Sequence, residues 1–149
     1  MHIEQSPYKS ITFDSKDIDQ EMWEARTLAE ATLIFNKEST RQGRTWEQVY
    51  SKCRQGQASE LWLLSKGFKD DLRPYHDVIH PDGTPIEVKT SKWEARYILN
   101  RYAEKLKSRP RDWPNTVYVF HNNPSETLYS WTGIFVWNGK SFIGSRPTL

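Results

Sequence analysis

Apolar residues recur with helical spacing through the first half of the chain. One stripe predicts a helix over residues 17–35; its members are Ile18, Met22, Ala25, Leu28, Ala29, Thr32 and Leu33. A polar stretch with a turn at Gly43 follows, and Thr45 with Gln48 then forms the capping-box pattern that opens a second helix. Gly56 interrupts this helix, which continues or restarts until Gly67 stops it.

In the second half of the chain, segments with alternating apolar residues and segments of continuous apolar residues replace most of the helical spacing. The segments YHDVIH and PIEVKT, joined by Pro-Asp-Gly, predict a β-hairpin. Ser91 and Glu94 form a second capping-box pattern, which opens a helix over residues 93–109. One apolar stripe runs along this helix; it consists of Ala95, Ile98, Leu99, Tyr102, Ala103 and Leu106.

Strand signals dominate the end of the chain. Pro110 and Pro114 end the helix, and TVYVFH then has the character of a buried strand. LYSW and GIFVW follow, and Asn138-Gly139 predicts a tight turn into SFIG.

The order of elements is two helices, two strands, a helix, a strand and further strands. It predicts an α/β (α+β) fold in which helices flank a small central mixed β-sheet. We expect a single domain over residues 1–149, with an N-terminal helical segment at about 17–54 and C-terminal strands at about 128–144.

Composition narrows the class of protein. The chain has 149 residues, 36% hydrophobic residues and a mean hydropathy of -0.81, and we expect neither a membrane span nor a secretory leader. Its single cysteine, Cys53, rules out an internal disulfide and favours a cytoplasmic location. The net charge is only +2, so any affinity for nucleic acid must come from local clusters of cations.

The predicted hairpin concentrates ionisable groups. Strand alternation puts Glu87 and Lys89 on one face, and the turn folds Asp77 back beside them. Closely packed carboxylates resist ionising together unless a cation neutralises them, and oxygen ligands suit Mg²⁺. The pattern therefore indicates a metal-dependent site that cleaves phosphodiesters.

These residues resemble the PD-(D/E)XK nuclease superfamily over about residues 56–121, which implies a restriction-endonuclease-like core. Asp77 matches the first motif acid, although His76 stands in place of the motif's proline, and Glu87-Val88-Lys89 matches E-x-K. The family often carries a further acid on the preceding helix. Glu60 is the preferred candidate for that acid, and Glu47 is the alternative.

The resemblance assigns roles to these residues. Asp77, Glu87 and the backbone carbonyl of Val88 would ligate Mg²⁺, with Mn²⁺ able to substitute. Lys89 would position or activate the attacking water, and Glu60 would add to the metal shell or hold a bound water. The implied function is a magnesium-dependent endonuclease, site-specific on double-stranded DNA, of the restriction, homing or phage type. The sequence has no P-loop pattern, so we expect no nucleotide cofactor.

Other interpretations remain open. The same fold could serve a structure-selective nuclease, such as a Holliday-junction resolvase, or a non-enzymatic DNA-binding module. A solvent-facing hairpin with ordinary surface charges would show the same residues. We expect His76 and His80 to point away from the catalytic face. The spacing of the histidines and Cys53 fits neither an HNH nuclease nor a zinc site.

Two basic clusters could hold DNA phosphates. The first surrounds Gly43 and consists of Lys37, Arg41 and Arg44. The second follows the hairpin and consists of Ser91, Lys92, Arg96 and Arg101. For each cluster the alternative is an ordinary solvated surface.

A single active site cuts one strand, which predicts a homodimer or higher homo-oligomer. The helix around Trp23 and Leu28 has no catalytic assignment, so it is the candidate interface.

Overall fold

A computed structural model describes residues 12–39, 43–71, 77–108 and 113–145. Its α-helices are α1 (Gln20–Ile34), α3 (Trp46–Ser65) and α4 (Ala95–Ser108). A 3₁₀ turn (Ser15–Asp17) precedes α1, and a π-helical segment (Phe35–Ser39) follows it. The strands are β1 (Thr12–Asp14), β2 (Lys69–Asp70), β3 (Val78–Ile79), β4 (Pro85–Ser91), β5 (Thr116–His121), β6 (Leu128–Trp137) and β7 (Phe142–Ser145).

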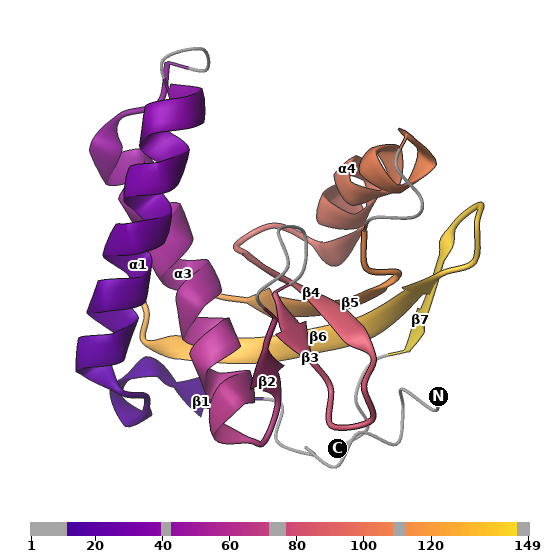
Figure 1. Cartoon of the computed structure of the whole chain (residues 1–149), viewed down its shortest axis with the longest axis horizontal. Helices are drawn as coiled ribbons and strands as arrows, with labels where there is room; N and C mark the ends of the chain where they lie inside the picture. Colours follow the sequence, from indigo (N-terminus) through magenta and orange to yellow (C-terminus); the bar gives the residue numbers. More distant parts are fainter. Residues whose placement is uncertain (1–11, 40–42, 72–76, 109–112, 146–149) are drawn as a thin grey trace.

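The strands form one curled, mixed sheet, as the sequence predicted (Figure 1). Their order is β1-β6-β5-β4-β3-β2, with β7 paired to β6. β4 and β5 are parallel and the other pairs are antiparallel, because α4 carries the chain from the end of β4 back to the start of β5.

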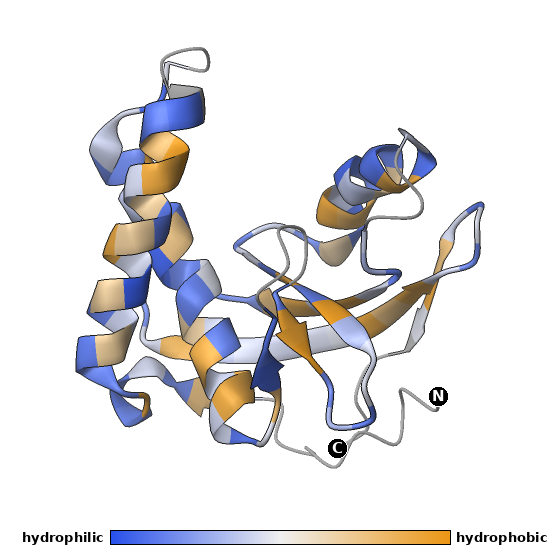
Figure 2. Ribbon diagram, viewed as in Figure 1, coloured by the Kyte–Doolittle hydropathy of each residue, from blue (hydrophilic) through white to orange (hydrophobic). Residues whose placement is uncertain are grey.

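Helices cover both faces of the sheet (Figure 1). On β4, Ile86 and Val88 pack in the core that α3 covers. The second core lies between the opposite face and α4, whose stripe is buried or packed there as predicted; it includes Leu99, Tyr102, Leu106, Val117, Val119 and Trp137. Hydrophobic residues accordingly appear both on the strands and on the helices that pack against them (Figure 2).

The expected apolar stripe of the first helix is wrong along α1, although its first member, Ile18, is buried just before the helix begins. Met22, Leu28 and Leu33 are about half exposed, whereas Trp23 is buried and forms part of the core. The Trp23 indole N–H donates to the carbonyl of Arg54 at 2.8 Å, and the Arg54 guanidinium lies 3.6 Å from the ring centroid. A tryptophan buries more area than any residue of the expected stripe, so it decides how α1 is rotated. Trp23 was also expected to form part of a subunit interface. Because it is buried within the chain, that expectation is wrong for Trp23.

The helix boundaries confirm one capping box and contradict the other. The Thr45 hydroxyl accepts from the Gln48 N–H and the Gln48 side chain accepts from the Thr45 N–H, as predicted. The following helix runs through Gly56 without a break and ends before Gly67, whose φ is +102°.

Ser91 does not cap α4. It is the last residue of β4, and α4 begins only at Ala95. Parallel pairing with β5 continues to Ser91 opposite His121 and keeps the backbone extended there. The Ser91 hydroxyl instead accepts from the Trp93 N–H at 2.9 Å.

The C-terminal hairpin is confirmed. The Asn138 N–H donates to the Ser141 carbonyl at 3.1 Å, and Gly139 has a φ of +97°. Among the described helices, none combines the length and apolar character needed to cross a membrane.

Candidate active site

The β3–β4 hairpin places Asp77 against β4. The His80 N–H donates to the Thr84 carbonyl at 2.9 Å, and Gly83 takes a φ of +93° to close the turn. Asp77 lies one residue before β3, and its Oδ2 accepts from the Val88 N–H at 2.7 Å. The expectation that the turn folds Asp77 back beside the Glu-Val-Lys segment is confirmed.

Glu87 and Lys89 share the face of β4 that is turned towards α4. Lys89 Nζ lies 3.0 Å from Glu87 Oε1 and 5.1 Å from the centroid of the Tyr102 ring. Tyr102 is itself fixed, because its hydroxyl donates to the Pro114 carbonyl at 3.0 Å. The ammonium is thus held between a carboxylate and an aromatic ring.

The backbone of Val88 belongs to the same site. In an extended strand the N–H and C=O of one residue point to the same side. Because the Val88 N–H meets Asp77, its carbonyl oxygen also points to this edge of β4. The edge therefore offers oxygens from Asp77, Glu87 and the Val88 carbonyl.

Glu60 joins the cluster from α3, where it is buried. Burial raises the pKa of Glu60, and the negative charges of Asp77, Glu30 and Glu87 raise it further, while Arg26 opposes them. Glu47 is exposed in the first turn of the same helix, about three and a half turns away. Of the two candidate helix acids, the structure brings Glu60 to the hairpin acids.

Asp77 is likewise affected by burial and by a neighbouring negative charge. Burial raises the pKa of Asp77, and so does the charge of Glu87, whereas the Val88 N–H and the Lys89 ammonium act in the opposite direction. Asp77 and Glu60 therefore resist ionising together in this surrounding. A positive charge placed among them would stabilise the ionised set.

A polar network behind Glu60 was not predicted from the sequence. Arg26 donates to Gln57 at 2.7 Å and to Asp70 at 2.7 and 3.2 Å, and it approaches Glu60 at 3.4 Å. The Gln57 amide donates to Glu30 at 3.0 Å. Burial alone would lower the pKa of Arg26, but the charges of Asp70, Glu60 and Glu30 raise it.

A sequence signal for this network did exist. Arg26 and Glu30 follow Trp23 at three and seven positions, so all three lie on one side of α1. A stripe centred on Trp23, rather than on Leu28, would have placed both charged residues towards α3. Their contacts with Gln57 and Glu60 are long-range, so local spacing alone does not reveal them.

The donor set suits a hard cation. Within the described ranges, no three His, Cys, Asp or Glu side chains are grouped closely enough to hold a metal ion as they stand. The carboxylate oxygens of Asp77 and Glu87 with the Val88 carbonyl are nevertheless the oxygen ligands that Mg²⁺ accepts. Burial raises the pKa values of Asp77 and Glu60 most, and the repulsion between neighbouring carboxylates, which such an ion would relieve, raises them further.

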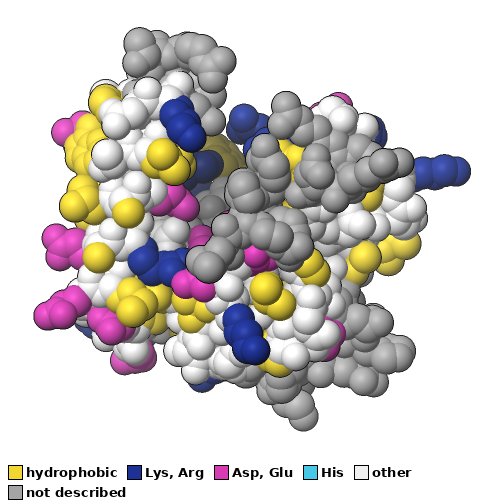
Figure 3. All heavy atoms as spheres, in the orientation of Figure 1, with side chains coloured by type: hydrophobic (Ala, Val, Ile, Leu, Met, Phe, Trp, Pro, Cys, Tyr) yellow, Lys and Arg dark blue, Asp and Glu magenta, His cyan; other side chains and the backbone are white. Residues whose placement is uncertain are grey.

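Cations gather beside the acids. The partial burial of Lys52 lowers its pKa, and the nearby positive charges of Lys89, Arg101 and Arg44 lower it further. Figure 3 shows Lys and Arg side chains around the hollow between the α1–α3 pair and α4. Lys52 was not among the residues predicted from the sequence, because nothing near it in the chain marks it.

The remaining predicted DNA contacts differ in their placement. Lys92, Arg96 and Arg101 are exposed beyond β4 and on α4. Arg96 forms an ion pair with Glu94 at 3.1 Å, and Ser91 lies at the end of β4 instead of at a helix start. Lys37 is exposed, and Arg41 lies outside the described residues.

The histidines and the cysteine have structural surroundings. His80 lies 3.0 Å from Asp82 and packs edge-on against Phe68, whereas His76 falls outside the described residues. Cys53 is buried, and burial together with the charge of Glu30 raises its pKa to about 12. A thiol in this environment is protonated at neutral pH.

Comparison of the chain with protein-family models, with curated proteins and with solved structures gives no match.

Proposed function

We propose that this protein is a magnesium-dependent DNA endonuclease with a restriction-endonuclease-like core of the PD-(D/E)XK type. The observation that carries the proposal is the bond from the Val88 N–H to Asp77 Oδ2, next to the Glu87–Lys89 pair. It brings two acids and a lysine from neighbouring strands to one end of a hairpin, with Glu60 reaching them from α3.

Each residue has a role that its position allows. Asp77, Glu87 and the Val88 carbonyl would hold the ion, which supplies Lewis-acid polarisation of the phosphate and a lower pKa for bound water. Lys89 offsets the charge that builds on the phosphate oxygens and orients the attacking water. Glu60 would add to the metal shell or hold a bound water. Lys52 and Arg101, whose positive charges lie near each other, would bind the phosphates of the strand being cut.

Cleavage of supercoiled plasmid in Mg²⁺ tests the proposal. Asp77→Asn keeps an oxygen for the Val88 N–H and removes the charge, whereas Lys89→Met removes the ammonium and keeps the chain length. We expect each variant to cut at least about 100-fold more slowly than the wild type, the loss typical of removing one electrostatic stabiliser of a transition state.

Matched controls come from α4. Glu104 and Lys107 are exposed and lie 3.7 Å apart, so Glu104→Gln and Lys107→Met make the same chemical changes at an exposed pair on α4. Both controls should cut like the wild type. Undiminished cutting by Asp77→Asn or Lys89→Met, in protein purified in the same way, would show that the activity does not arise from this site.

A further inference from the structure

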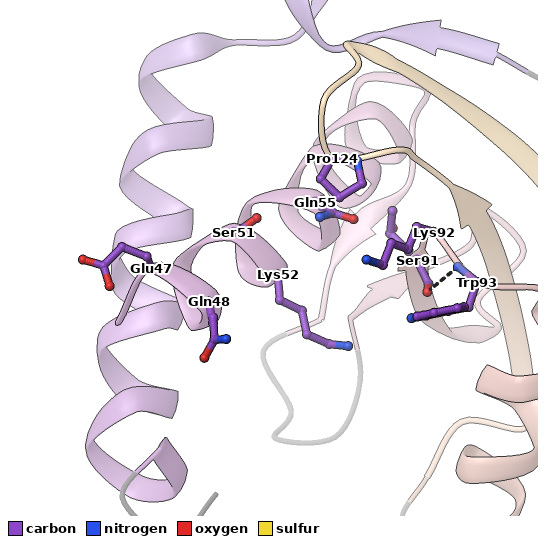
Figure 4. Close-up of a pocket in the computed structure, with 10 residues that line it drawn as sticks. Glu47, Gln48, Ser51, Lys52, Gln55, Ser91, Lys92, Trp93 and Pro124 are labelled. Carbon is purple, nitrogen blue, oxygen red and sulfur yellow. Dashed lines mark hydrogen bonds between the residues drawn. The ribbon is translucent and has the colours of Figure 1, made fainter. Parts of the chain in front are cut away.

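A pocket of about 400 Å³ adjoins the candidate active site. It lies between the first half of α3 and the turn that links β4 to α4, with the β5–β6 loop on a third side (Figure 4). Its lining residues are Glu47, Gln48, Ser51, Lys52, Gln55, Thr90, Ser91, Lys92, Trp93 and Pro124. Thr90 and Ser91 directly follow Lys89 on β4, so the pocket begins where the candidate active site ends.

The charge of the pocket is positive. Lys52 reaches into it from α3, and Lys92 stands on the facing turn (Figure 4). Glu47, the acid among the lining residues, points away from the space between them (Figure 4). Because Lys89, Arg101 and Arg44 add to the positive potential around Lys52, an anion entering here would relieve repulsion between cations.

An exposed aromatic ring, Trp93, lines this pocket, and a second, Tyr97, follows in the first turn of α4. Trp93 is 63% exposed and Tyr97 is 55% exposed, although residues of this type bury most of their area when they serve a core. Lys92 Nζ lies 5.2 Å from the Trp93 ring and the Arg96 guanidinium lies 5.0 Å from the Tyr97 ring. The bond from the Trp93 N–H to the Ser91 hydroxyl fixes the backbone under the indole.

A planar ring beside phosphate-binding lysines is the arrangement that holds a single-stranded nucleotide, because any base can stack on it. In a duplex both faces of each base are covered by its neighbours. An unpaired base can therefore offer a face to Trp93 that a base in the interior of a duplex cannot.

We infer that this pocket takes an unpaired nucleotide of DNA next to the cleaved bond. Its base stacks on Trp93, and its phosphates lie against Lys52 and Lys92. The inference rests on the proposed function, and it names the substrate class as duplex DNA with an adjoining single-stranded segment, such as a fork or an overhang.

Binding without cleavage tests the inference separately from the proposed function. The Asp77→Asn protein, in buffer free of divalent ions, is titrated with a blunt duplex and with the same duplex carrying a short overhang. A 2-aminopurine in the overhang reports stacking, since its emission falls when the base stacks on an aromatic ring. We expect tighter binding of the overhang substrate and a fall in emission.

A second substitution, added to the same protein, assigns the effect to the indole. Trp93→Ala should weaken overhang binding by about 5- to 150-fold, which corresponds to about 1–3 kcal/mol for one stacked base, and should abolish the fall in emission. Trp93→Phe keeps a ring and should retain most of both. Lys92→Ala should reduce the slope of log affinity against log salt by about 1, whereas Lys16→Ala, an exposed lysine of the 3₁₀ turn, should not.

The outcomes separate the two proposals. Equal affinity for both substrates, or unchanged overhang binding by Trp93→Ala with a native circular dichroism spectrum, would overturn the inference even if the wild type cuts DNA. Failure of the wild type to cut in Mg²⁺, together with Trp93-dependent stacking, would overturn the proposed function and leave the nucleotide pocket standing.

Discussion

Arg26→Met tests the charge network that supports the candidate site. Arg26 lies 3.4 Å from Glu60, and its side chain is only 24% exposed. Methionine fills a similar volume but leaves the buried Glu60 carboxylate without its positive neighbour. It also removes the donors to Gln57 and Asp70. We expect the variant to fold with lower stability.

The expected loss of stability depends on which partners of Arg26 are left without a positive charge. Removing one member of a buried ion pair costs about 3–5 kcal/mol. The Asp70 side chain is 43% exposed, so water replaces Arg26 there and the loss at Asp70 is small. The 3.4 Å separation from Glu60 is long for an ion pair, which favours the low end, about 3 kcal/mol. For a chain of this size, that corresponds to a fall in Tm of about 6–12 °C.

The loss should also depend on pH. Without Arg26 the pKa of Glu60 rises further above its value in the unfolded chain, so the native state binds more protons than the unfolded state. Stability of the variant then falls more steeply as pH rises. The difference from the wild type should be greatest at alkaline pH and should shrink at acid pH, where Glu60 is protonated.

Urea unfolding at pH 5 and pH 8 measures the loss of stability and its dependence on pH. The double variant Arg26→Met with Glu60→Gln completes a double-mutant cycle. We expect Glu60→Gln to recover most of the loss, because the uncompensated charge is gone. A loss of the same size at both pH values, or a double variant as unstable as Arg26→Met, would refute the charge explanation.

Three further predictions concern the fold around the site. Asp77→Asn should raise the Tm of the metal-free protein at pH 8 and change it less at pH 5, because burial and Glu87 raise the pKa of Asp77 and its ionisation costs stability as pH rises; an equal Tm at pH 8 would contradict this. Leu106→Ala should cost about 2–5 kcal/mol in urea unfolding, since Leu106 is fully buried between α4 and the sheet. Thr45→Ala should cost about 1 kcal/mol by removing the N-cap of α3, which the same unfolding experiment measures.

The hairpin could be predicted from the sequence because its determinants are local. The turn around Gly83 sets the register, and strand alternation then fixes which of Asp77, Glu87 and Lys89 lie together. The stripe of α4 was predictable for the same reason. Each of these features depends on residues that lie close together in the chain.

The surroundings of the hairpin could not be predicted in the same way. The rotation of α1 depends on Trp23 packing against Arg54, and Glu30 and Arg26 reach the acid cluster only as a result of that rotation. The start of α4 is delayed because pairing with β5 keeps Ser91 extended. Lys52 enters the site because α3 packs beside β4. All of these depend on tertiary packing, which local patterns do not contain.

Binding of Mn²⁺, followed by the loss of the electron paramagnetic resonance signal of the free ion, tests most directly whether Asp77 and Glu87 share one cation. Mn²⁺ accepts the same oxygen ligands as Mg²⁺. Measured with a cleavage-resistant duplex present, the wild type and Glu104→Gln should bind the ion with the same affinity, and Asp77→Asn and Glu87→Gln should each lose that binding. Equal binding by all four proteins would contradict the assignment of this hairpin as a metal site.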